Sequence, residues 1–320
     1  MTAPTPEPSA ASGQAREAGS TTAANGAILF STLLWGTLWI PMRQMESAGL
    51  GGAPAPVFGF LIGLIVLLPF GLARWRRVLG GGWPVLVAGF FMAATIALYA
   101  EGLVRGQVAR VILLFYLTPV WSTLLGRLLL GEAITARRVL TIALGLGGML
   151  VIFGAEAGPP LPRSAADWMG LVSGMAWGLS MVYVNKTAER PLLDRMVVQF
   201  VFLAPIFYLL TLLPGERGLA EAPTGLYAGS SLWLAAFALV WMLPLVWLTY
   251  FGASRLDPGR VAIFLMLEIV VGLGSAALLT DEPFGLSELA GAALIMSAGL
   301  TEVVAKRPRP SSPLRSSRSP

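Results

Sequence analysis

Long apolar runs follow one another along almost the whole chain, and each is about long enough to cross a bilayer. A helix needs roughly 20 residues to span about 30 Å of hydrocarbon. Ten such runs lie approximately at residues 26–45, 55–73, 84–104, 108–130, 136–154, 168–186, 194–213, 230–252, 260–280 and 286–304. They are continuous rather than alternating with period two, which favours helices over a barrel. The runs therefore predict an all-α integral membrane protein with ten transmembrane helices.

The composition supports this class. Apolar residues make up 56% of the 320 residues, charged residues make up 12%, and the mean hydropathy is +0.74. A soluble globule of this length needs far more polar surface than these residues can supply.

The chain also repeats itself within its apolar part. Residues 117–132 read LTPVWSTLLGRLLLGE and residues 267–282 read LEIVVGLGSAALLTDE, with several apolar positions and the closing glutamate in register. The match extends upstream at the same offset to three further pairs, Gly102 with Gly252, Arg105 with Arg255 and Arg110 with Arg260. Internal repeats of this size in a hydrophobic chain are typical of transporters built from two halves.

An odd number of helices in each half has a consequence for topology. A five-helix unit that starts inside ends outside, so the second unit must be inverted. We therefore expect two inverted five-helix repeats around a central cavity, at residues 26–155 and 156–305, which can rock to give alternating access. The flanking segments, 1–25 and 306–320, are rich in small, polar and Pro residues and are predicted to be disordered tails.

The distribution of Lys and Arg predicts the orientation. Both are more frequent in the segments that share a side with the two termini, for example at Arg76, Arg77, Arg137 and Arg138, than in the segments on the opposite side. Because Lys and Arg are retained on the cytoplasmic side, we expect both termini in the cytoplasm. The predicted location is the bacterial inner membrane, which the chain crosses many times.

Several short motifs resemble the EamA branch of the drug/metabolite transporter superfamily. They are Trp35-Gly36 and Trp177-Gly178, LTPV at 117–120, LLLGE at 128–132, GLGG at 145–148, LEIVV at 267–271 and LLTDE at 278–282. The resemblance covers residues 26–304, although Ile269 stands where the family often has Pro and Asp281 where it often has Gly. It implies a carrier with ten helices in inverted repeats that exports, or sometimes imports, small metabolites such as amino acids, coupled to protons or by exchange.

Glu268 is the ionisable residue that most suggests function. It falls near the middle of the predicted ninth helix, where a charged carboxylate is costly unless it faces protein, water or a cation. We expect it to bind a cationic group of the substrate or to carry the coupling proton. The alternatives are a structural ion pair with Arg127 or Arg110, or a hydrogen bond to a helix break.

Aromatic side chains are predicted to surround the cavity together with Glu268. Trp35 and Trp39 share a face of the first helix, and Trp177 occupies the place of Trp35 in the sixth. The further candidates are Tyr99, Tyr116 and Tyr250 in the third, fourth and eighth helices. Such a cage accepts amphipathic or cationic solutes, whereas ordinary packing or an interfacial belt is the alternative.

Pro119 interrupts the fourth helix in sequence. It leaves the carbonyl of Phe115 without its usual donor, beside the hydroxyl of Thr118. This place is a candidate polar lining for the cavity or a hinge, and a kink needed only for packing is the alternative. Glu101 and Arg105, four residues apart, are predicted to pair on a helix surface.

Residues that are missing narrow the chemistry further. The chain has no His and no Cys, so we expect no imidazole relay, no thiolate chemistry and no soft metal site. We find no phosphate-binding loop, no cluster of acidic residues that suggests an enzyme, and no reason to expect a cofactor. The expected partners are a small-molecule substrate, membrane lipids and, as a candidate coupling ion, protons, but not nucleic acid; the chain is expected to be a monomer or homodimer.

These features together predict a secondary transporter of amino-acid-like, amphipathic or cationic metabolites. It is expected to export them by alternating access, and proton coupling is a candidate driving force. A substrate exchanger or facilitator without proton coupling is one alternative, and a non-transporting scaffold or sensor is another. A carrier requires a polar cavity near the midplane, whereas a scaffold would have an apolar core with Glu268 paired.

Overall fold

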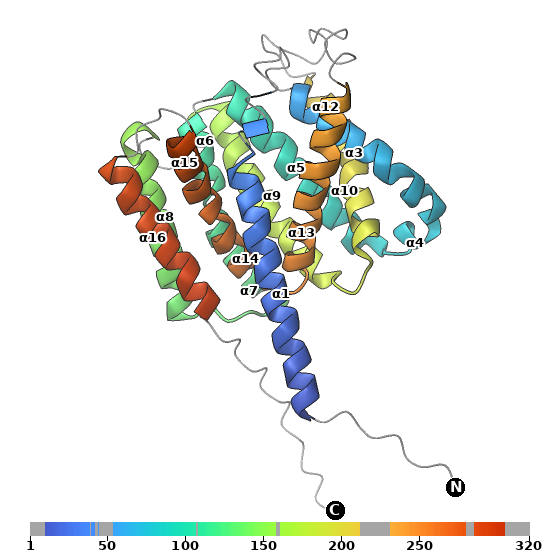
Figure 1. Ribbon diagram of the computed structural model, residues 1–320, viewed down its shortest axis with the longest axis horizontal. Helices are drawn as coiled ribbons and strands as arrows, with labels where there is room; N and C mark the ends of the chain where they lie inside the picture. The colour runs from blue at the N-terminus through green and yellow to red at the C-terminus, as the bar shows by residue number, and fades with distance from the viewer. Residues whose placement is uncertain are drawn as a thin grey trace, which may run out of the picture.

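The computed structural model describes residues 10–38, 40–41, 44, 54–106, 108–157, 161–211, 231–279 and 285–304, and the regular elements in these ranges are helices (Figure 1). Up to residue 157 they are α1 (Ala10–Gly36), α3 (Pro54–Ala73), α4 (Trp75–Leu79), α5 (Gly82–Arg105), α6 (Val108–Phe115), α7 (Thr118–Leu130) and α8 (Ala136–Ala157). After residue 160 they are α9 (Ala165–Lys186), α10 (Leu192–Thr211), α12 (Ser231–Ala236), η2 (Phe237–Met242), α13 (Leu243–Ala253), α14 (Pro258–Leu265), α15 (Leu267–Leu279) and α16 (Leu286–Val304).

Many of these helices suit a bilayer. Within the described residues, six segments are long and apolar enough to cross it: Gly82–Leu103, Arg110–Leu130, Ala136–Phe153, Leu192–Leu210, Leu232–Ala253 and Pro258–Leu279. Shorter apolar helices cover Phe60–Ala73 and Leu286–Thr301. The prediction of an all-helical membrane protein is thus confirmed, whereas ten crossings in inverted repeats stay a prediction.

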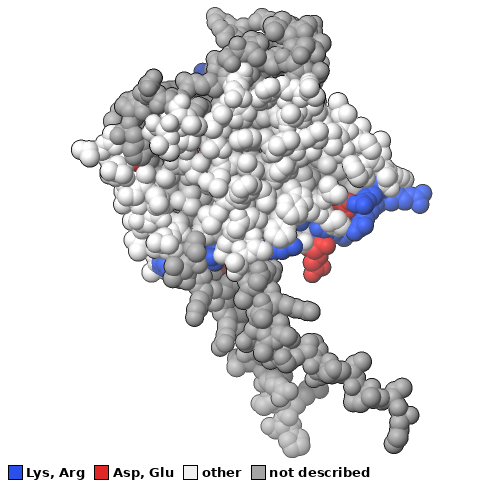
Figure 2. Space-filling model, viewed as in Figure 1, with Lys and Arg blue, Asp and Glu red and all other residues white. Residues whose placement is uncertain are grey.

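The surface has the character that lipid requires. Large apolar side chains point outward, among them Leu128 and Val240, which are 76% and 72% exposed. In the view of Figure 2, Lys and Arg gather along the lower rim, and the broad surface above it is almost free of charge. Helix α4, which carries the exposed Arg76 and Arg77, lies at this rim (Figure 1). A charge-free band above a charged edge matches a bilayer and its headgroups.

The N-terminal segment differs from the predicted tail. Helix α1 begins at Ala10, inside the range 1–25 that composition assigns to a disordered tail. The added part is rich in Ala, the residue with the highest helix propensity, so it extends the apolar helix that follows. Residues 1–9 and the predicted tail at 306–320 lie outside the described residues.

Two long helices are interrupted at corresponding places of the internal repeat. Tyr116 and Leu117 separate α6 from α7, and Met266, at the repeat offset from Tyr116, separates α14 from α15. In the first break, Pro119 cannot donate to the Phe115 carbonyl, and the hydroxyl of Thr118 donates to that carbonyl instead. Tyr116 and Met266 pack in one buried cluster, so the two breaks face each other inside the molecule.

The continuous helical stretch formed by α12, η2 and α13 contains a π-helical segment. Residues Phe237–Met242 form a π-helix directly before Pro244, near the start of α13. The ring of a helical Pro crowds the carbonyl four residues earlier, and a wider π turn relieves that contact while rotating the helix beyond it. The indole Nε1 of Trp241, in the π segment, donates to the Leu34 carbonyl at 3.1 Å and so holds this region against α1.

Packing between the two parts of the chain is reciprocal. Helix α1 packs against α14 and α15, and α9 packs against α6 and α7, so the first helix of each part contacts the interrupted helix of the other. Glycines permit both approaches: a Cβ on Gly36 would lie 2.6 Å from the Glu268 carbonyl oxygen, and a Cβ on Gly178 would lie 3.1 Å from the Ser122 nitrogen. Helices α8 and α16 pack on each other.

Candidate functional site

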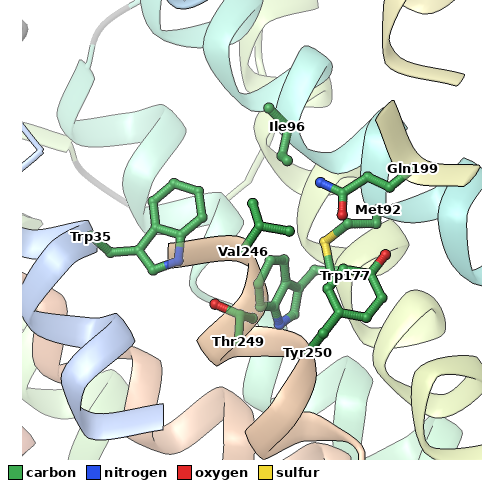
Figure 3. Close-up of a pocket in the computed structure, with 8 residues that line it drawn as sticks. All are labelled: Trp35, Met92, Ile96, Trp177, Gln199, Val246, Thr249 and Tyr250. Carbon is green, nitrogen blue, oxygen red and sulfur yellow. The ribbon is translucent and has the colours of Figure 1, made fainter. Parts of the chain in front are cut away.

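A small cavity lies between helices that are far apart in sequence. It is lined by Trp35 of α1, Met92 and Ile96 of α5, Trp177 of α9, Gln199 of α10, and Val246, Thr249 and Tyr250 of α13 (Figure 3). The cavity volume is about 10 Å³, which is room for about one water molecule. A metabolite would therefore need the surrounding helices to move apart.

Three polar groups at this cavity have no hydrogen-bond partner among the residues that the structure describes. They are both amide atoms of Gln199, the hydroxyl of Tyr250 and the indole Nε1 of Trp35. Gln199 and Tyr250 are both 0% exposed, and a buried polar group without a partner costs about 1–3 kcal/mol. Figure 3 shows the Gln199 amide and the Tyr250 ring on one side of the cavity and Trp35 on the other. Each of these groups needs a hydrogen-bond partner, and a bound water or a polar solute can supply it.

Arg195 lies next to Tyr250, a residue of the cavity wall, but does not line the cavity itself. It lies one turn before Gln199 on α10, its side chain is buried, and Nη1 donates to the Val184 carbonyl at 3.1 Å and to the Ser254 Oγ at 2.7 Å. Its guanidinium stands 5.8 Å from the centroid of the Tyr250 ring. A cation over an aromatic face is attractive, so Arg195 fixes Tyr250 and places a positive charge close to the cavity.

A cluster of aromatic rings connects the cavity to Glu268. The ring of Phe115 lies 6.5 Å from that of Trp177, 4.4 Å from that of Tyr99 and 5.0 Å from that of Tyr116. Tyr99 and Tyr116 in turn interact electrostatically with the Glu268 carboxylate. Among the described residues, the buried Tyr116 hydroxyl has no hydrogen bond of regular geometry, so its contact with Glu268 is mainly electrostatic.

Glu268 lies in the first turn of α15, directly after the break at Met266, and its side chain is half-buried. The ion pairs expected as alternatives are absent: within the described residues no Lys or Arg pairs with Glu268. Arg110 instead binds Asp167, with its Nη2 at 2.9 Å and its Nε at 3.1 Å from the same carboxylate oxygen. The side chain of Arg127 is exposed.

The predicted site residues therefore divide into groups. Trp35, Trp177 and Tyr250 line the cavity, and Tyr99, Tyr116 and Glu268 gather beyond Phe115. Thr118 is buried with its hydroxyl engaged by the Phe115 carbonyl, so it stabilises the break and offers little to a solute. Trp39 lies outside the described residues.

Sequence analysis missed part of the cavity wall, above all Gln199. The missed lining residues are Met92, Ile96, Gln199, Val246 and Thr249. A signal for Gln199 exists, because it is a lone amide within the apolar stretch VVQFVF of α10, and polar side chains inside membrane helices tend to face other helices or a cavity. The four other residues look like any apolar or Thr residue of a helix. No group of His, Asp or Glu able to hold a metal ion occurs in the part of the chain that the structure describes.

Comparison with known proteins connects this geometry to a family. The sequence model of the EamA-like transporter family matches residues 23–154 and 164–300. A crystal structure that is 23% identical in sequence matches with a TM-score of 0.65, covering 88% of this chain and 96% of the other. At that identity the likeness concerns the fold alone.

Two bacterial relatives carry names. An uncharacterized transporter, YvbV, of Bacillus subtilis is 26% identical over 279 residues, which is 85% of this chain and 88% of the relative. A probable amino-acid metabolite efflux pump of Escherichia coli is 26% identical over 184 residues, or 55% of this chain. That match spans only 61% of the pump's own length.

Proposed function

Because this chain belongs to the EamA-like transporter family, we propose that it is a secondary transporter that exports small metabolites by alternating access. Family and named relatives make the protein a membrane transporter and not an enzyme. The proposed substrates are amino-acid-like, or otherwise amphipathic or cationic, solutes. The name of the Escherichia coli relative, a probable amino-acid metabolite efflux pump, supports this class.

The proposed architecture is ten transmembrane helices in two inverted repeats, residues 26–155 and 156–305. The reciprocal packing of α1 on α15 and of α9 on α7, together with the matched interruptions at Tyr116 and Met266, supports a pseudo-two-fold relation. Interrupted helices that meet near the midplane are typical of inverted-repeat carriers. The basic rim in Figure 2 supports cytoplasmic termini in a bacterial inner membrane.

One observation carries the proposal: a cavity between both parts of the chain, with unpartnered polar groups and a Trp from each part in its wall. Trp35 and Trp177 both line this cavity, and each is the first residue of a Trp-Gly pair. A cavity of about 10 Å³ holds no metabolite, so transport requires the two parts to separate on one side at a time. The same small volume favours the runner-up, a non-transporting scaffold.

Glu268 is the proposed coupling residue. Its carboxylate has no cationic partner among the described residues and faces two tyrosine hydroxyls. It can therefore exchange a proton or bind a cationic group without first breaking a structural ion pair.

Flux in proteoliposomes tests both proposals. Radiolabelled amino acids and related metabolites are offered with and without a pH gradient to the wild-type protein and to Glu268→Gln, which keeps the shape and removes the charge. We expect gradient-driven flux in the wild type that falls at least about tenfold in the variant. Equal flux in both, independent of the gradient, would support an exchanger or facilitator. No flux of any solute by correctly folded protein would support the scaffold.

A further inference from the structure

Arg195 is a buried cation whose charge the described residues do not balance. It is 2% exposed, and within the described part of the chain no carboxylate lies within ion-pair distance of it. Among the described residues it donates to two neutral oxygens, and its Nε has no partner there. A buried charge is costly when no opposite charge accompanies it, so the surroundings of Arg195 favour a negative group.

The groups between Arg195 and the cavity can each donate a hydrogen bond, and the Gln199 Oε1 and Tyr250 hydroxyl can also accept one. Tyr250 holds its ring over the guanidinium at 5.8 Å and carries an unpartnered hydroxyl. Gln199, four residues after Arg195 on the same face of α10, lines the cavity with an unpartnered amide. Trp35 adds an unpartnered indole N–H, a group that can only donate.

Resting on the proposed transport function, we propose that Gln199 and the Tyr250 hydroxyl bind the carboxylate of the transported solute, with the charge of Arg195 behind them. A carboxylate accepts several hydrogen bonds and supplies the missing negative charge. An ammonium group could donate to the Gln199 Oε1 or the Tyr250 hydroxyl, but it would meet the like charge of Arg195. Glu268 does not line this cavity and lies beyond the rings of Phe115 and Tyr116, so the expected preference for a carboxylate does not depend on it.

Matched pairs of solutes test the carboxylate directly. Thermal unfolding of the purified full chain is followed with L-phenylalanine and L-leucine and with their decarboxylated amines, 2-phenylethylamine and isopentylamine. A ligand that binds the folded state raises Tm in a saturable manner. We expect the two amino acids to raise Tm and the two amines to bind at least about tenfold more weakly, since hydrogen bonds to a charged group carry such differences.

Three variants assign the effect to residues. Tyr250→Phe keeps the ring over Arg195 and removes only the hydroxyl, and Gln199→Leu keeps the approximate volume and removes the amide. Each should weaken amino-acid binding about tenfold with little change in Tm without solute. Gln199→Glu should shift the preference toward the amines. The matched control is Tyr183→Phe, at the end of α9 outside the cavity, which should bind as the wild type does.

The inference fails if the amines stabilise the wild type as well as the amino acids do, if no carboxylate solute stabilises it, or if Tyr250→Phe and Gln199→Leu keep the full preference. A single bound water as the occupant of the cavity would give the second of these results. Flux separates this from the proposed function: binding with the expected preference but no flux would overturn transport alone, and flux of amines over amino acids would overturn the carboxylate site alone.

Discussion

At the scale of single residues, Gly36 makes one of the close approaches between distant parts of the chain. A Cβ there would lie 2.6 Å from the Glu268 carbonyl oxygen and 2.6 Å from the Cβ of Val271. Gly36 thereby allows α1 to touch the backbone that carries Glu268. The Trp-Gly pair of the family resemblance has a physical reason here: the Trp faces the cavity while the Gly admits a neighbouring helix.

Gly36→Ala should therefore destabilise the protein by about 1–3 kcal/mol, since backbone must shift to make room, and should also lower flux because Glu268 moves. Thermal unfolding in detergent measures the first effect. Gly274→Ala is the matched control on α15, where an added Cβ meets nothing within 4 Å and helix propensity favours Ala. Equal loss of Tm in both variants would contradict a special role for the contact at Gly36.

At the scale of elements, a buried ion pair joins α6 to the start of α9. Arg110 and Asp167 are 8% and 2% exposed. Arg110 also donates to the Leu161 carbonyl at 2.7 Å, and the Asp167 carboxylate accepts the Arg163 N–H at 2.9 Å. All these partners come from two distant stretches of chain, so the pair fixes how the parts meet at one end.

Asp167→Asn should cost about 3–5 kcal/mol of stability, because it removes the negative charge that accepts two hydrogen bonds from the buried Arg110 guanidinium. The predicted pair of Glu101 and Arg105 is present at 2.5 Å and is a suitable comparison. It is more exposed, and Glu101→Gln should cost about 0–1 kcal/mol. Unfolding curves of both variants decide the matter, and similar losses would show that burial does not set the strength of the Arg110 pair.

At the scale of the whole molecule, the orientation in the membrane can be tested with single cysteines, because the natural chain has none. Ala165 and Ala188 are exposed at opposite ends of α9. With cytoplasmic termini, Ala165→Cys should react with a membrane-impermeant maleimide on intact cells, and Ala188→Cys only after permeabilisation. The buried Ala93→Cys should stay unlabelled in both. The opposite pattern would reverse the proposed orientation.

Sequence patterns predict some site residues and miss others, because only some residue types are unusual inside a membrane helix. Glu268 stands out because a carboxylate inside an apolar helix is costly wherever that helix packs. Trp35 and Trp177 stand out because of the repeat. Gln199 does not, because a neutral amide is a weak signal, and in the sequence the buried Arg195 serves only as a marker of topology.

The amino-acid sequence is enough to establish the class of this protein. Lipid offers no partners to backbone N–H and C=O groups, so apolar runs of this length must become helices, and the repeat and motifs identify the family. Which side chains meet depends on how the helices pack. Phe115 links Trp177 to Tyr99 and Tyr116, and Arg195 stands under Tyr250. Periodicity along one helix tells which residues share a face, but contacts between helices distant in the chain depend on how those faces pack.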